Sequence, residues 1–140
     1  SKRGFMKNSL LPLLIFCLST FTAAEESQQT APEGPHGGSV VSGKHNKFEV
    51  TIDPTQKSVH VYTLEAKKGA PKKMRITLFR ERGSGNTIDL QSMNLKEALP
   101  QYQGKLSVAN DSYVGVELRF ETGLKKLEVL KFIPYMPTRK

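Results

Sequence analysis

The sequence of 140 residues is long enough for one domain, and its 21 basic and 13 acidic residues give a formal net charge of +8. It contains one cysteine and no tryptophan. A single cysteine excludes an internally disulfide-bonded scaffold, so burial of apolar side chains must hold the fold together.

The N-terminal segment has the pattern of a cleavable secretory signal. A short basic region at 6–7 precedes an apolar run at 10–21, small residues at 22–24 and an acidic pair at 25–26. The apolar run is shorter than the roughly 20 residues that a membrane-spanning helix needs. We therefore expect a signal peptide over 1–24, cleaved near Ala24, with retention as an N-terminal anchor as the alternative.

Two further features of the N-terminal segment concern its processing. Residues 1–5 precede the expected start methionine, Met6. Lipidation of Cys17 would require a small residue before it, and Phe16 is bulky, so we interpret Cys17 as an apolar member of the signal.

Cleavage would change the composition and charge of the chain. The mature chain would keep 18 basic and 13 acidic residues, a net charge of +5, and no cysteine. We expect a periplasmic or secreted protein without a transmembrane span, for which nucleic acid is a poor partner.

The rest of the chain divides into three parts. Residues 25–36 are polar and contain two prolines, which predicts a flexible tether. Residues 37–134 contain the strand patterns and form the predicted domain. Residues 135–140 form a basic tail.

Short alternating stretches separated by turn residues dominate the domain. Alternation of apolar and polar residues is typical of half-buried strands. It predicts strands over 39–41, 47–53, 58–66, 74–81, 87–90, 102–109, 113–121 and 127–132. The stretch 91–99 is ambiguous, because it also fits one or two helical turns before Pro100.

Seven or eight strands at intervals of about ten residues favour an antiparallel β-sandwich, with immunoglobulin-like or cupredoxin-like architecture, over any βαβ arrangement. The alternation predicts a core whose members are Phe48, Val50, Ile52, Val59, Val61, Ile76, Leu78, Leu106, Val114, Val116, Leu118, Phe120, Leu127 and Val129.

The three histidines, His36, His45 and His60, are the candidate metal ligands. Imidazole suits Cu(II) or Zn(II), and imidazole with thioether suits Cu(I), so copper or zinc is the possible cofactor. If the first two strands form a hairpin, His36 and His45 lie toward its opposite ends. If the strand after His36 lies beside 58–66 instead, His36 could approach His60.

The methionines could supply the thioether, although they more often pack in a core. Those in the expected mature chain are Met74, Met93 and Met136. The structural alternative for His60 is a rim residue on a polar face.

Lysines cluster in one predicted loop, at Lys67, Lys68, Lys72 and Lys73, with further basic residues at 80, 82 and 125–126. They could bind an anionic envelope surface such as phospholipid, lipopolysaccharide or an acidic protein. The alternative is a solvated surface whose lysines protect sheet edges from pairing.

No catalytic motif appears. The sequence lacks the GxSxG pattern, and Gly83-Ser84-Gly85 has neither the lysine nor the helix of a phosphate-binding loop. We therefore expect a protein that is not an enzyme.

One segment resembles a known group of proteins. HGG at 36–38, FEV-x-I-D-P at 48–54 and V-x-V-Y at 59–62 resemble small exported bacterial domains related to segments of periplasmic heavy-metal efflux adaptors. The residues that carry the resemblance are His36, Gly37, Gly38, Phe48, Glu49, Val50, Asp53, Pro54, Val59, Val61 and Tyr62. It implies a β-sandwich, a metal-associated context and a binding role for His36. The helical hairpin and lipoyl-like segments of a full adaptor are missing.

Two functions follow as expectations. The first is a non-catalytic periplasmic binding module in copper or zinc homeostasis or efflux, with an efflux component as its partner. The second is an envelope structural or adaptor protein that docks a protein or an anionic surface through a sheet edge or its basic loops.

Overall fold

The computed structural model of the protein describes residues 29–82, 85–93, 96, 99–107 and 113–135. The predicted signal peptide lies outside the described residues, as does the predicted basic tail apart from Tyr135.

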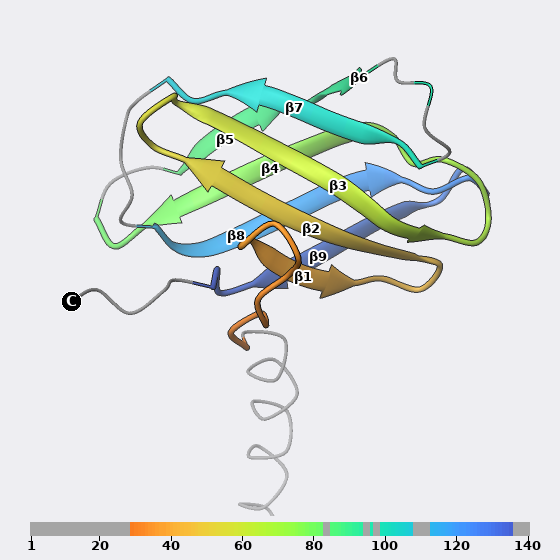
Figure 1. The fold of residues 1–140 in the computed structure, drawn as a ribbon, viewed down its shortest axis with the longest axis horizontal. Coiled ribbons are helices and arrows are strands. Elements are labelled where there is room, and N and C mark those ends of the chain that lie inside the picture. The colour runs from red at the N-terminus through yellow and green to blue at the C-terminus, as the bar shows by residue number, and fades with distance from the viewer. Residues whose placement is uncertain (1–28, 83–84, 94–95, 97–98, 108–112, 136–140) are drawn as a thin grey trace, which may run out of the picture.

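Within these ranges the chain forms strands and no helix (Figure 1). The nine strands are β1 (Ser39–Ser42), β2 (Asn46–Asp53), β3 (Ser58–Ala66), β4 (Lys72–Arg80), β5 (Asn86–Asp89), β6 (Gln91–Met93), β7 (Gln101–Lys105), β8 (Tyr113–Glu121) and β9 (Leu127–Phe132). The all-β prediction is confirmed, and the ambiguous stretch after β5 begins as a strand.

The strands form two sheets that lie one behind the other (Figure 1). The five-stranded sheet has the order β1-β2-β3-β7-β6, and the four-stranded sheet has the order β5-β4-β8-β9. All neighbouring strands are antiparallel. The architecture is therefore sandwich-like, and β1–β2 is a hairpin.

The β2–β3 hairpin shows how local sequence sets this arrangement. Phe48 and Val50 point inward from β2 and are buried. The turn after β2 is stabilised by the Asp53 carboxylate, whose Oδ1 accepts the backbone N–H groups of Thr55 at 3.0 Å and Gln56 at 3.1 Å. Such side-chain bonds make Asp a favoured turn residue.

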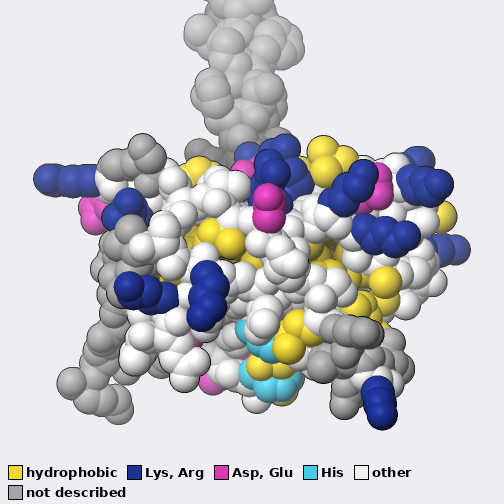
Figure 2. Space-filling model, turned by 90° about the horizontal axis from the view of Figure 1, so that it is seen from above, with side chains coloured by type: hydrophobic (Ala, Val, Ile, Leu, Met, Phe, Trp, Pro, Cys, Tyr) yellow, Lys and Arg dark blue, Asp and Glu magenta, His cyan; other side chains and the backbone are white. Residues whose placement is uncertain are grey.

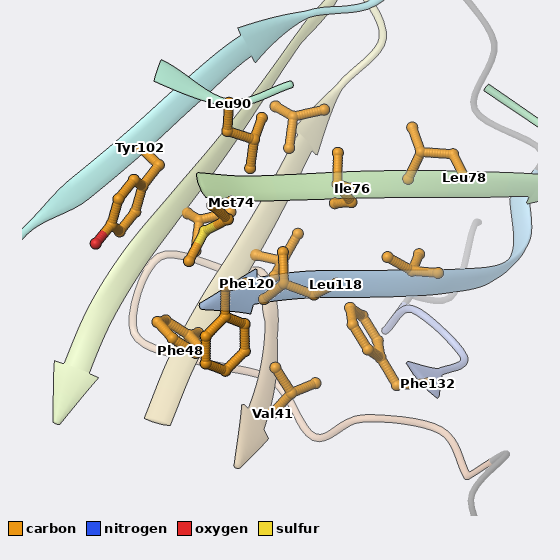
Figure 3. Packing of buried hydrophobic residues seen from close by; sticks show 14 of the residues in the cluster. Val41, Phe48, Met74, Ile76, Leu78, Leu90, Tyr102, Leu118, Phe120 and Phe132 are labelled. Carbon is orange, nitrogen blue, oxygen red and sulfur yellow. The ribbon is translucent and has the colours of Figure 1, made fainter. Parts of the chain in front are cut away.

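The core lies between the two sheets (Figure 3). Phe48 from the five-stranded sheet and Phe120 from the four-stranded sheet meet edge to face, with ring centroids 5.0 Å apart. Full burial of each such side chain stabilises the fold by about 1.5–3 kcal/mol. The predicted core residues that are buried are Phe48, Val50, Val59, Val61, Ile76, Leu78, Leu106, Val116, Leu118 and Phe120, with Ile52 packed against them half-buried.

The prediction of Val114 as a core residue is wrong, because its side chain is 50% exposed. Phe79 pairs with Gly115 while Arg80 pairs with Tyr113, so Val114 is an extra residue at a β-bulge. A bulge breaks the alternation of faces. Tyr113 is buried in place of Val114.

The predicted face of β9 is also wrong. Leu127 is 65% exposed and Val129 is only half-buried, whereas Phe132 is buried and Leu130 packs against the core. Register explains the difference, since Leu130 pairs with the buried Leu118 of β8. Each face of β9 carries two apolar side chains and one charged side chain, so alternation alone does not fix which face is buried.

The end of the predicted tether pairs with the domain. Thr30 bridges Ile133, the Ala31 N–H donates to the Ile133 carbonyl at 2.9 Å, and the Val40 N–H donates to the Pro32 carbonyl at 2.9 Å. Ala31 is buried. The packed domain therefore begins before the boundary that the sequence predicts.

Candidate functional site

Glu49 is a buried carboxylate on the outer face of the five-stranded sheet. It lies on β2 between Val40 of β1 and Tyr62 of β3, and its side chain is 0% exposed. The loop of residues 34–38, here called the His36 loop, covers it. Glu49 Oε2 accepts the backbone N–H groups of His36 at 2.7 Å and Gly38 at 2.9 Å, and its Oε1 lies 2.6 Å from His36 Nδ1.

Glycines allow the His36 loop to fold over the carboxylate. The Gly34 N–H donates to the Gly38 carbonyl at 2.9 Å, and the Gly37 N–H donates to the Gly34 carbonyl at 3.0 Å. Gly37 has a φ of 80°, which favours glycine. A Cβ on Gly38 would lie 2.4 Å from the Val50 carbonyl oxygen, and one on Gly34 would lie 2.6 Å from the Glu49 carboxylate. The close approach of loop and strand therefore depends on these residues.

The surroundings of Glu49 keep it ionised. Burial opposes the charged form, but hydrogen bonds from the His36 side chain and from the N–H groups of Gly38 and His36 outweigh it. The pKa of Glu49 is consequently lowered from its ordinary value of 4.5. An ionised carboxylate only accepts hydrogen bonds, so His36 Nδ1 is the donor.

Three rings form a stack on the same face of the sheet. The His36 and Tyr62 rings are 3.8 Å apart and 3° from parallel, and the His60 and Tyr62 rings are 4.2 Å apart and 18° from parallel. His60 is further held by Gln101 of β7, whose Oε1 lies 2.7 Å from His60 Nε2. Figure 2 shows histidine side chains gathered in one patch beside hydrophobic side chains.

These bonds fix which ring nitrogen of His36 is available. With Nδ1–H donated to Glu49, the neutral ring carries its lone pair on Nε2. No described residue hydrogen-bonds to Nε2, and the His36 side chain is 46% exposed. A carboxylate behind one nitrogen of a histidine is the arrangement that orients metal-ligating imidazoles. In the neutral ring, Nε2 is thus the exposed nitrogen that does not face Glu49.

The stack keeps His36 and His60 apart as ligands. Both rings lie parallel to Tyr62 and two rings cannot share one of its faces, so they lie on opposite faces. Nitrogen ligands sit about 2.0–2.1 Å from zinc, which places two of them within about 4 Å of each other. The separation of two stacked layers is larger, so the predicted approach of His36 and His60 does not produce a shared ion site in this arrangement. Among the residues that the structure describes, no group of three or more His, Cys, Asp or Glu could hold a metal ion.

His45 lies elsewhere. It follows β1 in the turn before β2, and its carbonyl accepts the Lys67 N–H at 2.9 Å, whereas His36 precedes β1. The hairpin therefore places these two histidines toward opposite ends, as the sequence predicts for this topology. The four predicted anion-binding lysines, Lys67, Lys68, Lys72 and Lys73, are all exposed around the β3–β4 connection.

The sequence allows the methionines to act either as thioether ligands or as core residues, and the structure places two of them differently. Met74 is buried in the core. Met93 is half-buried on β6, and its register partner Gln101 is also the partner of Tyr62. Met93 therefore lies in the same row of the outer face as Tyr62. Met136 lies outside the described residues.

The sequence does not reveal the role of Glu49. Alternation places it on the outer face, where a glutamate is ordinarily solvated, and its cover comes from a loop eleven or more residues earlier. The one available signal is the glycine content at 34, 37 and 38, which indicates a close backbone approach without naming what is approached.

A scan against protein-family models found no match, and searches of curated proteins and of solved structures returned none either. In the described part of the chain, no helix has the length and apolar character needed to cross a membrane.

Proposed function

We propose that the protein is a non-catalytic binding module of the bacterial envelope that holds a copper or zinc ion through His36. The observation that carries the proposal is the hydrogen bond from His36 Nδ1 to the buried Glu49, which leaves Nε2 with the lone pair on an exposed ring.

The chemistry of this nitrogen favours a borderline or soft transition metal. Imidazole binds zinc and copper well, and a carboxylate on the other nitrogen makes the ring a better donor. The cost of orienting His36 is met on folding, by Tyr62 on one ring face and Glu49 on Nδ1. The ion therefore meets a ligand whose rotamer and tautomer are already set.

A single imidazole leaves most coordination positions of the ion open. Structural zinc sites fill four positions from the protein, whereas sites with fewer protein ligands keep places for other molecules. An ion held by His36 would exchange with water or with donors from a partner. Such exchange fits delivery or capture of metal in the envelope, with an efflux component as the partner.

The proposal also covers the absence of catalytic activity, the type of β-sandwich and export. In the described part of the chain no hydroxyl or thiol is hydrogen-bonded to His36, so the Glu49–His36 pair lacks the nucleophile that such a pair would activate. The two-sheet arrangement is compatible with an immunoglobulin-like or cupredoxin-like sandwich, and the N-terminal signal pattern supports export.

Calorimetric titration of the full chain with Cu(II), Zn(II) and Cu(I) tests the proposal. We expect His36→Ala to weaken binding about tenfold or more, which corresponds to about 1.4 kcal/mol. His45→Ala is the matched control and should leave the affinity unchanged, because His45 lies in another turn. Equal affinities of the wild type and His36→Ala would overturn the proposal.

A further inference from the structure

Three chain connections meet at one end of the sandwich. The Lys67 N–H at the start of the β3–β4 connection donates to the His45 carbonyl in the β1–β2 turn at 2.9 Å. The β3–β4 connection also abuts the β8–β9 turn so closely that a Cβ on Gly123 would lie 1.7 Å from the Lys68 carbonyl oxygen. The β1–β2 turn contacts β9 as well, because the Lys44 N–H donates to the Glu128 carboxylate at 2.8 Å. All three connections lie at the right-hand end in Figure 1.

This end carries seven of the sixteen basic residues in the described part of the chain. Its seven lysines, here called the lysine end, are Lys44, Lys67, Lys68, Lys72, Lys73, Lys125 and Lys126, and all are exposed. Lys and Arg side chains are correspondingly dense at the right of Figure 2.

Few acidic groups oppose the lysine end. Glu121 lies 3.9 Å from Lys73, a distance at which an exposed pair contributes little. Glu128 accepts the Lys44 N–H, and Glu65 is exposed near the end of β3. The described connections therefore leave an excess of positive charge facing solvent.

Two exposed leucines accompany the lysines. Leu124 is 53% exposed in the β8–β9 turn and Leu127 is 65% exposed at the start of β9. Both line a groove of about 450 Å³ together with Lys44, His45 and Lys126. Apolar side chains flanked by lysines can enter the boundary between headgroups and acyl chains, while the ammonium groups stay at headgroup level.

We propose that the lysine end docks onto a bilayer that contains anionic phospholipid. The inference is independent of the His36 site, which lies on the outer face of the five-stranded sheet. Two observations favour a lipid surface over an acidic protein. The connections carry lysines and no arginine, and lysine acts as a point charge, whereas arginine forms the bidentate pairs of specific carboxylate recognition. In addition, the two exposed leucines would contribute nothing to a purely ionic contact, whereas they can enter a bilayer.

Co-sedimentation of the full chain with vesicles tests the inference. The vesicles are phosphatidylcholine alone, or phosphatidylcholine with phosphatidylglycerol. Binding to the neutral vesicles measures what the apolar N-terminal run contributes. We expect the protein to partition more strongly onto the anionic vesicles, and this increase in partitioning is the gain that the variants are compared by. A lysine near an anionic bilayer contributes about fivefold in partitioning, so the Lys67→Glu/Lys68→Glu double variant should lower the gain roughly 25-fold or more. Raising the salt concentration should lower it too.

A second double variant supplies the matched control. Arg82 and Lys105 are exposed at the opposite end of the strands, so Arg82→Glu/Lys105→Glu makes the same charge change away from the lysine end. We expect it to keep most of the gain, and Leu124→Ser/Leu127→Ser to lower it. Equal losses in both charge-reversal variants would overturn the inference. Wild-type binding no better to anionic than to neutral vesicles would do so as well, and would favour an acidic protein partner.

Discussion

Glu49 Oε1 lies 2.6 Å from Nδ1 of His36, although the two residues are thirteen positions apart and Glu49 is fully buried. The contact closes the His36 loop over the outer face of the sheet. It also fixes the proton on Nδ1. One pair thus connects the packing of the loop to the chemistry of the exposed ring.

The Glu49 carboxylate should stabilise the fold in a pH-dependent way. Its pKa is lowered in the folded protein, so its contribution is present above its ordinary value of 4.5 and is lost as pH falls from there through the lowered pKa. Glu49→Gln should lower the free energy of unfolding at pH 7 by about 2–4 kcal/mol. Both carboxylate oxygens of Glu49 accept N–H groups, whereas the NH2 group of glutamine cannot accept a hydrogen bond. Urea unfolding of both proteins between pH 7 and pH 3 measures this. The gap between wild type and variant should narrow below about pH 4.5, and a gap that stays constant would contradict the assignment.

The His36 loop should be more sensitive to a side chain at Gly38 than at Gly37. A Cβ on Gly38 would lie 2.4 Å from the Val50 carbonyl oxygen, so Gly38→Ala should cost about 3 kcal/mol or more as loop and strand separate. Gly37 has open space around it and only its φ of 80° to oppose alanine, so Gly37→Ala should cost about 1–2 kcal/mol. Thermal unfolding compares the two variants. The reverse order of their costs would show that the loop lies differently.

The sequence predicts the two-sheet architecture well and the site only in part. Strands such as β2 and β3 have one apolar and one polar face, so alternation identifies their elements and their buried residues. Alternation fails where strand pairing decides which face is buried, as at the bulge that turns Val114 outward and in β9, where each face carries both apolar and charged side chains.

The sequence likewise reveals some residues of the site and not others. The glycines and His36 are visible as a local motif, and the prediction attached a binding role to His36. The covering of Glu49 is a contact between a loop and a strand face, and the stack of His36 on Tyr62 joins residues from different elements. No local periodicity encodes such contacts.

Gly123 should hold the lysine end together. A Cβ there would lie 1.7 Å from the Lys68 carbonyl oxygen, so Gly123→Ala must separate the β8–β9 turn from the β3–β4 connection. We expect a loss of about 2–3 kcal/mol in unfolding free energy, with faster amide exchange in both connections. Gly115→Ala is the control, because a Cβ on Gly115 would lie 3.9 Å from the Phe79 ring, which is ordinary van der Waals contact. Equal costs for the two variants would contradict the close contact.

The aromatic contact between the sheets should dominate the core. Phe48 is fully buried and meets Phe120 edge to face, so Phe48→Ala should lower the free energy of unfolding by about 3–5 kcal/mol. Phe79 is 41% exposed on the outer face of the four-stranded sheet, and Phe79→Ala should cost less than about 1 kcal/mol. Denaturant unfolding gives both values. A small cost at Phe48 would mean that the sheets do not pack through this pair.

The central claim is that buried Glu49 presents His36 through Nε2, and long-range proton–nitrogen correlation NMR of the histidine rings tests it most directly. Recorded at neutral pH without metal, the spectrum should show His36 with its proton on Nδ1. Added Zn(II) should then perturb the Nε2 resonance of His36 and leave His45 unchanged. A neutral His36 with its proton on Nε2, or a His36 signal that zinc does not perturb, would contradict the account.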